Sequence, residues 1–88
     1  MLGRRELATG DGLLLRPTGS IHTWFMRFAI DAVFLDRELR VLRVASDMKP
    51  WRTAAARTAK AVLELPAGEA LRREIAVGDV LSVDGDAR

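Results

Sequence analysis

The sequence predicts a single α+β domain over residues 1–88, made mostly of antiparallel β-structure, with five to six short strands, one short helix and a sheet closed into a small barrel or roll. Two observations lead to this prediction. The chain has 88 residues, which is room for one hydrophobic core. Its apolar runs are short and separated by turn residues. Closure is expected because a barrel leaves no exposed sheet edge in so small a chain.

Strands are predicted wherever apolar or β-branched residues form a short run between turn residues. Residues 20–28 carry apolar side chains at both odd and even positions, which is typical of a central strand rather than an edge strand. Residues 31–35 and 39–45 flank a polar turn and are expected to pair as an antiparallel hairpin. The full set of predicted strands is 13–15, 20–28, 31–35, 39–45, 61–65 and 80–83.

One helix is predicted over residues 67–74, directly after a proline that ends the preceding strand. Within it Glu69 precedes Arg73 by four residues, which is the favourable order for an ion pair on a helix. Gly78 is expected to adopt a positive φ in a tight turn before the last strand. The pattern of residues 53–59 does not distinguish helix from coil.

The composition excludes several kinds of chemistry. Cysteine is absent, so the chain has no disulfide, thiol nucleophile or thiolate metal site. The lone histidine, His22, cannot supply the roughly four nitrogen or sulfur ligands that zinc takes, and the aspartates match no calcium loop. We therefore expect no metal and no cofactor. No apolar run approaches the roughly 20 residues of a membrane span and the amino end lacks a signal-peptide pattern, so we expect a cytoplasmic protein without membrane contact.

The charge balance does not favour a nucleic-acid partner. Fourteen basic against twelve acidic residues give a net charge of +2. The basic residues are interspersed with acidic and apolar ones around residues 36–43, which is typical of a solvated sheet face. A domain of this size also gains stability from a partner copy, so a homodimer is one option.

The most promising group for ligand binding combines the lone histidine with aromatic side chains and an arginine. Trp51 and Arg52 fall on a predicted loop, where binding residues are over-represented. Arg52 could hold a carboxylate or phosphate while the indole covers an apolar part of the ligand. The alternative is that Trp51 fills one end of the barrel. The predicted ligand-binding residues are His22, Trp24, Met26, Asp31, Trp51 and Arg52.

Three functions are compatible with these residues. The favoured one is a non-catalytic binding or interaction module whose groove takes an anionic small molecule or peptide. A small enzyme would use His22 as a base oriented by Asp31, but no nucleophile motif accompanies them, so no catalytic residue is assigned. A nucleic-acid-binding barrel would stack bases on Trp24 or Trp51 and would need four arginines on one face. These arginines are Arg37, Arg40, Arg43 and Arg52.

Four segments in fixed order carry a recognisable pattern. They are Ser-Ile-His-Thr-Trp-Phe-Met-Arg-Phe-Ala-Ile-Asp-Ala-Val-Phe-Leu-Asp at 20–36, Lys-Pro-Trp-Arg at 49–52, Val-Leu-Glu-Leu-Pro-Ala-Gly at 62–68 and Ile-Ala-Val-Gly-Asp at 75–79. The pattern resembles the domain of unknown function 192 family over residues 12–83. The resemblance implies a small, soluble, β-rich fold without an established activity. It also implies an amino end shorter than is usual in the family, and places Thr18 where many relatives have cysteine.

Overall fold

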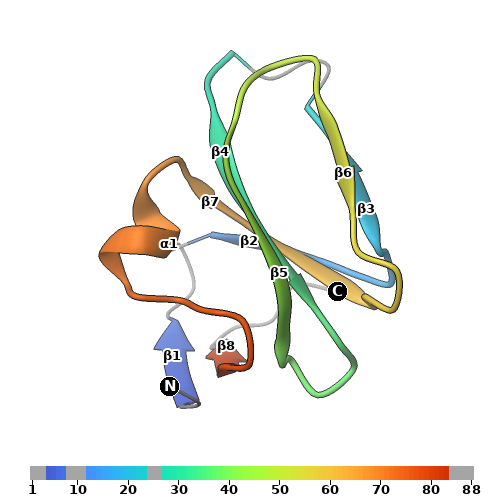
Figure 1. The fold of residues 1–88 in the computed structure, drawn as a ribbon, viewed down its shortest axis with the longest axis vertical. Coiled ribbons are helices and arrows are strands. Elements are labelled where there is room, and N and C mark those ends of the chain that lie inside the picture. Colours follow the sequence, from blue (N-terminus) through green and yellow to red (C-terminus); the bar gives the residue numbers. More distant parts are fainter. Residues whose placement is uncertain (1–3, 8–11, 24–26, 84–88) are drawn as a thin grey trace.

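The computed structural model describes residues 4–7, 12–23 and 27–83, and these form eight strands and one short helix (Figure 1). The elements in chain order are β1 (Arg4–Leu7), β2 (Leu13–Leu15), β3 (Ser20–His22), β4 (Ile30–Leu35), β5 (Val41–Met48), β6 (Thr53–Ala55), β7 (Ala61–Pro66), α1 (Glu69–Arg72) and β8 (Val80–Val83).

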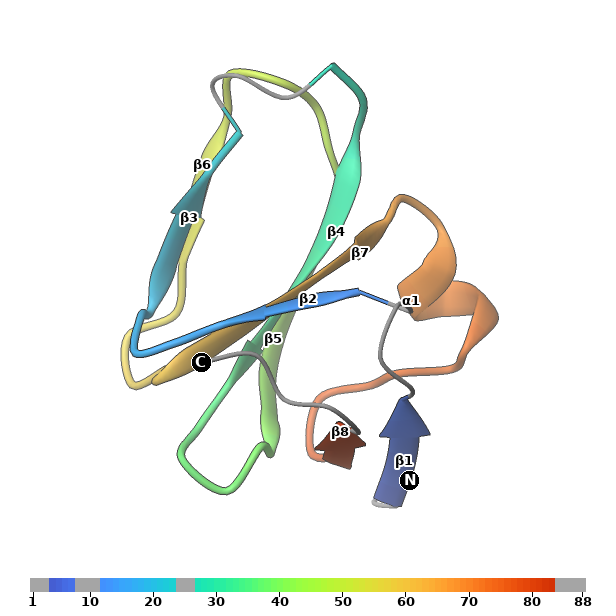
Figure 2. The same cartoon turned by 180° about the vertical axis from the view of Figure 1, so that it is seen from behind.

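Three sheets organise the described residues. The central sheet is antiparallel and has the strand order β2-β7-β4-β5, while β3 pairs with β6 and β1 pairs in parallel with β8. Figures 1 and 2 show the β3–β6 ribbon on one side of the central sheet and α1 with the β1–β8 pair on the other. The mostly antiparallel α+β class is confirmed.

The prediction of a closed barrel is wrong. Within the described ranges β2 and β5 are the two ends of the central strand order, so the sheet stays open. Closure is not needed to bury the apolar faces, because the ribbon covers one of them and the helix and the parallel pair cover the other. The chain therefore buries its core by layering.

β4 explains why the core lies on both faces of the central sheet. All six of its residues are buried, and it runs between β7 and β5. Because neighbouring residues of a strand point to opposite faces, one half of β4 faces α1 and the other faces β3. The helix-side cluster contains Leu14, Val33, Leu35, Val41, Ala61, Leu63, Leu65, Ala70, Ile75 and Leu81. The ribbon-side cluster contains Ile21, Ile30, Ala32, Phe34, Met48, Ala59 and Val62.

Several local predictions are confirmed. β4 and β5 form the expected antiparallel hairpin, and strands occur at 13–15, 61–66 and 80–83. Gly78 has a φ of 97°. The helix is shorter than predicted, because Gly68 has a φ of 94° and precedes the first helical residue, and the helix ends at Arg72. The predicted ion pair is present, with Arg73 Nε 3.0 Å from Glu69 Oε1.

The long strand predicted over residues 20–28 is wrong, since β3 ends at His22. The next residue, Thr23, is completely buried and fastens the chain to the loop after β5. Its hydroxyl donates a hydrogen bond of 2.6 Å to the Lys49 carbonyl and accepts one of 2.9 Å from the Arg52 amide. β3 pairs only with β6 among the described strands, so it belongs to a two-stranded ribbon and not to the centre of a sheet.

Two strands lie where no strand was predicted. β6 (Thr53–Ala55) occupies part of the segment whose state the pattern left open. β1 (Arg4–Leu7) pairs in parallel with β8, at the other end of the chain. Both strands are short and lack a clear apolar alternation, so their sequences do not predict them. They are recognised as strands by their pairing with β3 and β8, which are distant in sequence.

Candidate functional site

A hollow of about 430 Å³ lies at the corner where the chain turns from β2 into β3. Figure 2 shows these two strands diverging from that corner, with β7 behind β2. The hollow is lined by Leu15, Arg16, Pro17, Thr18, Ser20, Ile21, His22 and Glu64. It therefore brings the lone histidine together with a carboxylate, an arginine and two hydroxyls.

A second hollow of about 460 Å³ adjoins the first and shares Arg16 and Pro17 with it. A third, of about 210 Å³, continues from the second. The second hollow is lined by Arg16, Pro17, Asp36, Arg37, Lys60 and Ala61. The third is lined by Asp36, Arg37, Glu38, Thr58 and Lys60. Because each hollow shares residues with the next, we treat the three as one feature, the corner groove.

The charged residues of the second hollow are mostly cationic. Arg16, Arg37 and Lys60 line it, against the single carboxylate of Asp36. That carboxylate is engaged within its own turn, where Oδ1 accepts hydrogen bonds of 2.9 and 2.8 Å from two backbone amides. In the described ranges no ion pair joins Arg37 or Lys60 to another side chain. An anion entering this hollow would meet a positive field.

Backbone hydrogen bonds hold the cationic segments beside one another. The amide of Thr18 donates to the Lys60 carbonyl at 3.0 Å, and the amide of Lys60 donates to the Leu35 carbonyl at 2.8 Å. Arg16 precedes the first of these bonds by two residues, and Arg37 follows the end of β4 by two. The three cations thus come from segments that are separate in sequence but fixed by the strand ladder.

Glu64 is a site residue that the sequence reasoning missed. Alternation along β7 puts it on the same face as Val62, toward the β3–β6 ribbon. Its side chain is half-buried, and this burial raises the pKa of its carboxyl group. Among the described residues no hydrogen bond to that carboxylate is found. The available signal was a charged residue inside an otherwise apolar strand, Ala-Val-Leu-Glu-Leu.

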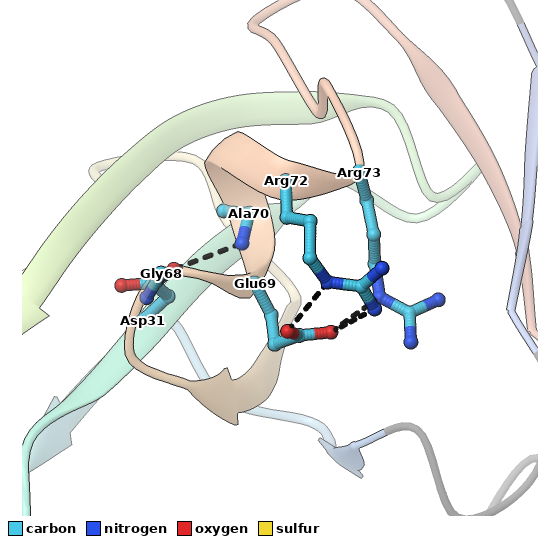
Figure 3. A network of polar contacts seen from close by, with 6 residues as sticks. All are labelled: Asp31, Gly68, Glu69, Ala70, Arg72 and Arg73. Atoms are coloured by element: carbon cyan, nitrogen blue, oxygen red, sulfur yellow. Dashed lines mark hydrogen bonds and ion pairs between the residues drawn. The ribbon is translucent and has the colours of Figure 1, made fainter.

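Asp31 does not take part in the groove. It is 1% exposed, and its Oδ1 accepts a hydrogen bond of 2.8 Å from the Asp47 amide. Its Oδ2 accepts two more, from the amides of Gly68 at 3.0 Å and Ala70 at 2.9 Å (Figure 3). Asp31 therefore lies on the helix side of the central sheet, whereas the strand of His22 covers the opposite side. The pairing of His22 with Asp31 on which an enzyme would depend is not formed.

Trp51 does not fill the interior, so the alternative of a packed indole is wrong. Its side chain is 62% exposed and its φ is 66°. The Trp51 amide donates to the Thr23 carbonyl at 2.9 Å, and Arg52 Nη1 donates to the Trp51 carbonyl at 3.3 Å. The residue after Arg52 is Thr53, which pairs with His22. Trp51 and Arg52 therefore directly precede the residue that pairs with the last residue of β3.

The remaining predicted site residues, Trp24 and Met26, lie outside the described residues. In the part of the chain that is described, no cluster of three or more His, Asp or Glu side chains could hold a metal ion. No described helix is long and apolar enough to cross a bilayer.

The arginines that nucleic-acid binding would need do not share a face. Arg40 Nη1 donates to the Gly78 carbonyl at 3.3 Å, toward β8. Arg43 Nη1 donates to the Ala55 carbonyl at 2.6 Å, and its guanidinium lies 5.8 Å from the centre of the Phe34 ring, on the ribbon side. The Arg40 and Arg43 side chains reach opposite sides of the central sheet. They therefore do not form a continuous basic track for a nucleic-acid backbone.

Fold and site together define a small α+β protein with a layered antiparallel sheet and a corner groove whose second hollow has an excess of cations. Residues 1–83 match the family model of DUF192, described as uncharacterized ACR, and the chain belongs to this family. A UPF0127 protein of Pyrococcus abyssi is 38% identical over 65 residues, which cover 73% of this chain and 55% of that protein. The chain thus spans about half the length of this relative.

A solved structure gives an independent comparison of the fold. The crystal structure of a protein of unknown function from Novosphingobium aromaticivorans aligns with a TM-score of 0.67 at 22% identity. The alignment covers 83% of this chain and 69% of that one. At this identity the likeness supports the shared fold and carries no activity with it.

Proposed function

We propose that the chain is a non-catalytic binding module whose corner groove takes an anionic small molecule or the acidic part of a peptide. The observation that carries the proposal is the convergence of Arg16, Arg37 and Lys60 on one hollow of about 460 Å³. Pockets for small ligands usually measure about 300 to 1,000 Å³. A ligand of ordinary metabolite size would therefore fit within reach of all three cations.

The lining of the hollow suits an anion with an apolar body. Arginine presents a planar fork that matches carboxylate and phosphate oxygens, and lysine adds a mobile point charge. Pro17 and Ala61 offer apolar surface between the charged groups. Few placed polar groups on an otherwise apolar wall are the usual composition of a ligand pocket.

The sequence-predicted residues His22, Trp51 and Arg52 extend this proposal beyond the hollows. His22 lines the corner groove, and its register partner Thr53 directly follows Trp51 and Arg52. An exposed indole beside a guanidinium would suit the less polar end of a longer ligand or a peptide. If they contact the ligand, Arg52→Ala will weaken binding with little change in the melting temperature.

Isothermal titration with inorganic pyrophosphate tests the proposal. We expect measurable binding that weakens as salt is raised, because exposed charges are screened. The double variant Arg37→Ala/Lys60→Ala should weaken binding by about tenfold or more, since charge-assisted hydrogen bonds are lost. Arg57→Ala is the matched control, because this exposed arginine lines none of the three hollows. Equal affinities for the double variant and the parent protein would refute the cationic hollow as the binding site.

Two further expectations accompany this function. The sequence predicts that the protein meets its ligand in the cytoplasm, and a homodimer is one option for its assembly. Both stay predictions, which cell fractionation and sedimentation measurements would test.

A further inference from the structure

We infer that the corner groove recognises its ligand in two parts, an anionic group beside Arg37 and Lys60 and a neutral hydroxyl-bearing body beside His22 and Glu64. The ligand class is then a polyhydroxylated anion, such as a sugar phosphate or a sugar acid. The inference rests on the proposed function, since it assigns the first hollow of the groove whose second hollow holds the anion.

Glu64 is the first reason for a hydroxyl-bearing body. Its carboxylate lines the first hollow, is half-buried, and accepts no hydrogen bond from any residue of the described ranges. Taking a carboxylate out of water without a partner is unfavourable, and burial accordingly raises the pKa of this group. A ligand that brings hydroxyl donors to Glu64 would compensate for that loss of hydration.

The two charged residues of the first hollow have opposite signs, so this hollow carries little net charge. A second anionic group on the ligand would be attracted by Arg16 but repelled by Glu64, and a cationic group would be attracted by Glu64 but repelled by Arg16. A neutral part that both donates and accepts hydrogen bonds meets neither penalty, and hydroxyls have this property.

The other polar groups of the hollow suit several hydroxyls. Ser20 and His22 are both exposed and lie two residues apart on β3, so they point to the same side of the ribbon. The Thr18 hydroxyl is already used, because it donates to the Ser20 carbonyl at 2.9 Å. The Ser20 hydroxyl and the Glu64 carboxylate therefore remain for a ligand, and they line the hollow from two different strands, β3 and β7.

The two parts adjoin each other. Arg16 and Pro17 line the first and the second hollow alike, so a ligand lying over these two residues would reach both hollows. Their volumes, about 430 and 460 Å³, are each of the size that accommodates a small ligand.

Titration with three probes on the whole chain tests the inference. The probes are glucose 6-phosphate, cyclohexyl phosphate, which has the same anion and a ring without hydroxyls, and glucuronate, which has a carboxylate in place of the phosphate. We expect glucose 6-phosphate to bind about tenfold tighter than cyclohexyl phosphate, the gain expected for a hydrogen bond to a charged group. Comparison of glucose 6-phosphate with glucuronate then identifies the preferred anion.

Two variants assign the preference to Glu64. Glu64→Leu should abolish the preference for glucose 6-phosphate and leave the affinity for cyclohexyl phosphate within about twofold, whereas Glu64→Gln, which still accepts hydrogen bonds, should retain part of it. Circular dichroism confirms that each variant is folded. Equal binding of the two phosphates by the parent protein, or a preference that survives in Glu64→Leu, would overturn the inference. Failure of both phosphates to bind the parent protein would instead overturn the proposed function.

Discussion

The amide of Ala70 donates a hydrogen bond of 2.9 Å to Oδ2 of Asp31, a residue 39 positions earlier in the chain. The first residues of a helix have amides without partners inside the helix, and a side chain directly before the helix usually accepts them. Here that position is held by Gly68, which has no side chain to do so. The buried carboxylate from β4 takes over this role and fastens α1 to the central sheet (Figure 3).

Replacement of Asp31 should therefore destabilise the fold strongly. Asp31→Ala leaves three backbone amides without their acceptor in a buried site, and we expect a loss of about 3 kcal/mol in the free energy of unfolding. Urea denaturation measures this loss. Asp36→Ala is the control, since it removes a less buried carboxylate that also accepts two amides, and water can replace it at a loss of about 1 kcal/mol. Equal losses would show that burial of Asp31 is unimportant.

Glu64 should make the protein less stable as pH rises. Burial raises the pKa of its carboxyl above 4.5, so the folded state holds the proton more tightly than the unfolded state. This contribution to stability is full below pH 4.5 and is lost as pH rises through the folded-state pKa. Glu64→Gln should therefore melt at a higher temperature than the parent protein at pH 7, and this advantage should shrink on acidification. A difference in melting temperature between Glu64→Gln and the parent protein that stays constant from pH 3 to pH 7 would contradict the raised pKa of Glu64.

Glu69 should make the protein less stable as pH falls, which is the opposite of the effect of Glu64. Hydrogen bonds from Arg72 and Arg73 lower the pKa of its carboxyl to about 2. Its contribution to stability is therefore present above pH 4.5 and is lost as pH falls toward 2. The difference in melting temperature between the parent protein and Glu69→Gln should therefore decrease as pH falls from 4.5 toward 2. The difference at neutral pH should also shrink in high salt, because these side chains are partly exposed.

The turn at Gly78 should not tolerate a branched side chain. Its φ is 97°, and its amide donates a hydrogen bond of 2.8 Å to the Val41 carbonyl. Gly78→Val would strain the backbone at this position and should lower the free energy of unfolding by more than about 1 kcal/mol. Ala76→Val, at an exposed position of the same turn, should change it by less than about 0.5 kcal/mol. Similar losses in both variants would reject backbone strain as the cause.

The parts of the fold that depend on neighbouring residues were predictable. The β4–β5 hairpin has two apolar runs on either side of a polar turn, and that turn is closed by the Asp36 side chain. Gly78 is identified by its place between an apolar run and a strand. The ion pair of Glu69 and Arg73 follows from helical spacing.

The failures have one physical origin. The segment 20–28, which was predicted as one strand, has apolar residues at both odd and even positions. The observed strand nevertheless ends at His22, because the buried Thr23 hydroxyl forms hydrogen bonds with the loop after β5. Asp31 has the sequence context of a strand residue and is used by a distant helix. In both cases a polar group finds its partner many residues away, and neither hydrophobic periodicity nor turn chemistry encodes that partner.

The α+β class, the β4–β5 hairpin and the family resemblance could be predicted without coordinates, because each depends on composition or on residues close together in the chain. Three other features depend on contacts between distant segments: the sheet is layered instead of closed, Trp51 is exposed, and Arg16, Arg37 and Lys60 converge. Their convergence follows from backbone hydrogen bonds such as Thr18 to Lys60. Almost any residue can form such bonds, so side-chain patterns do not reveal which segments they join.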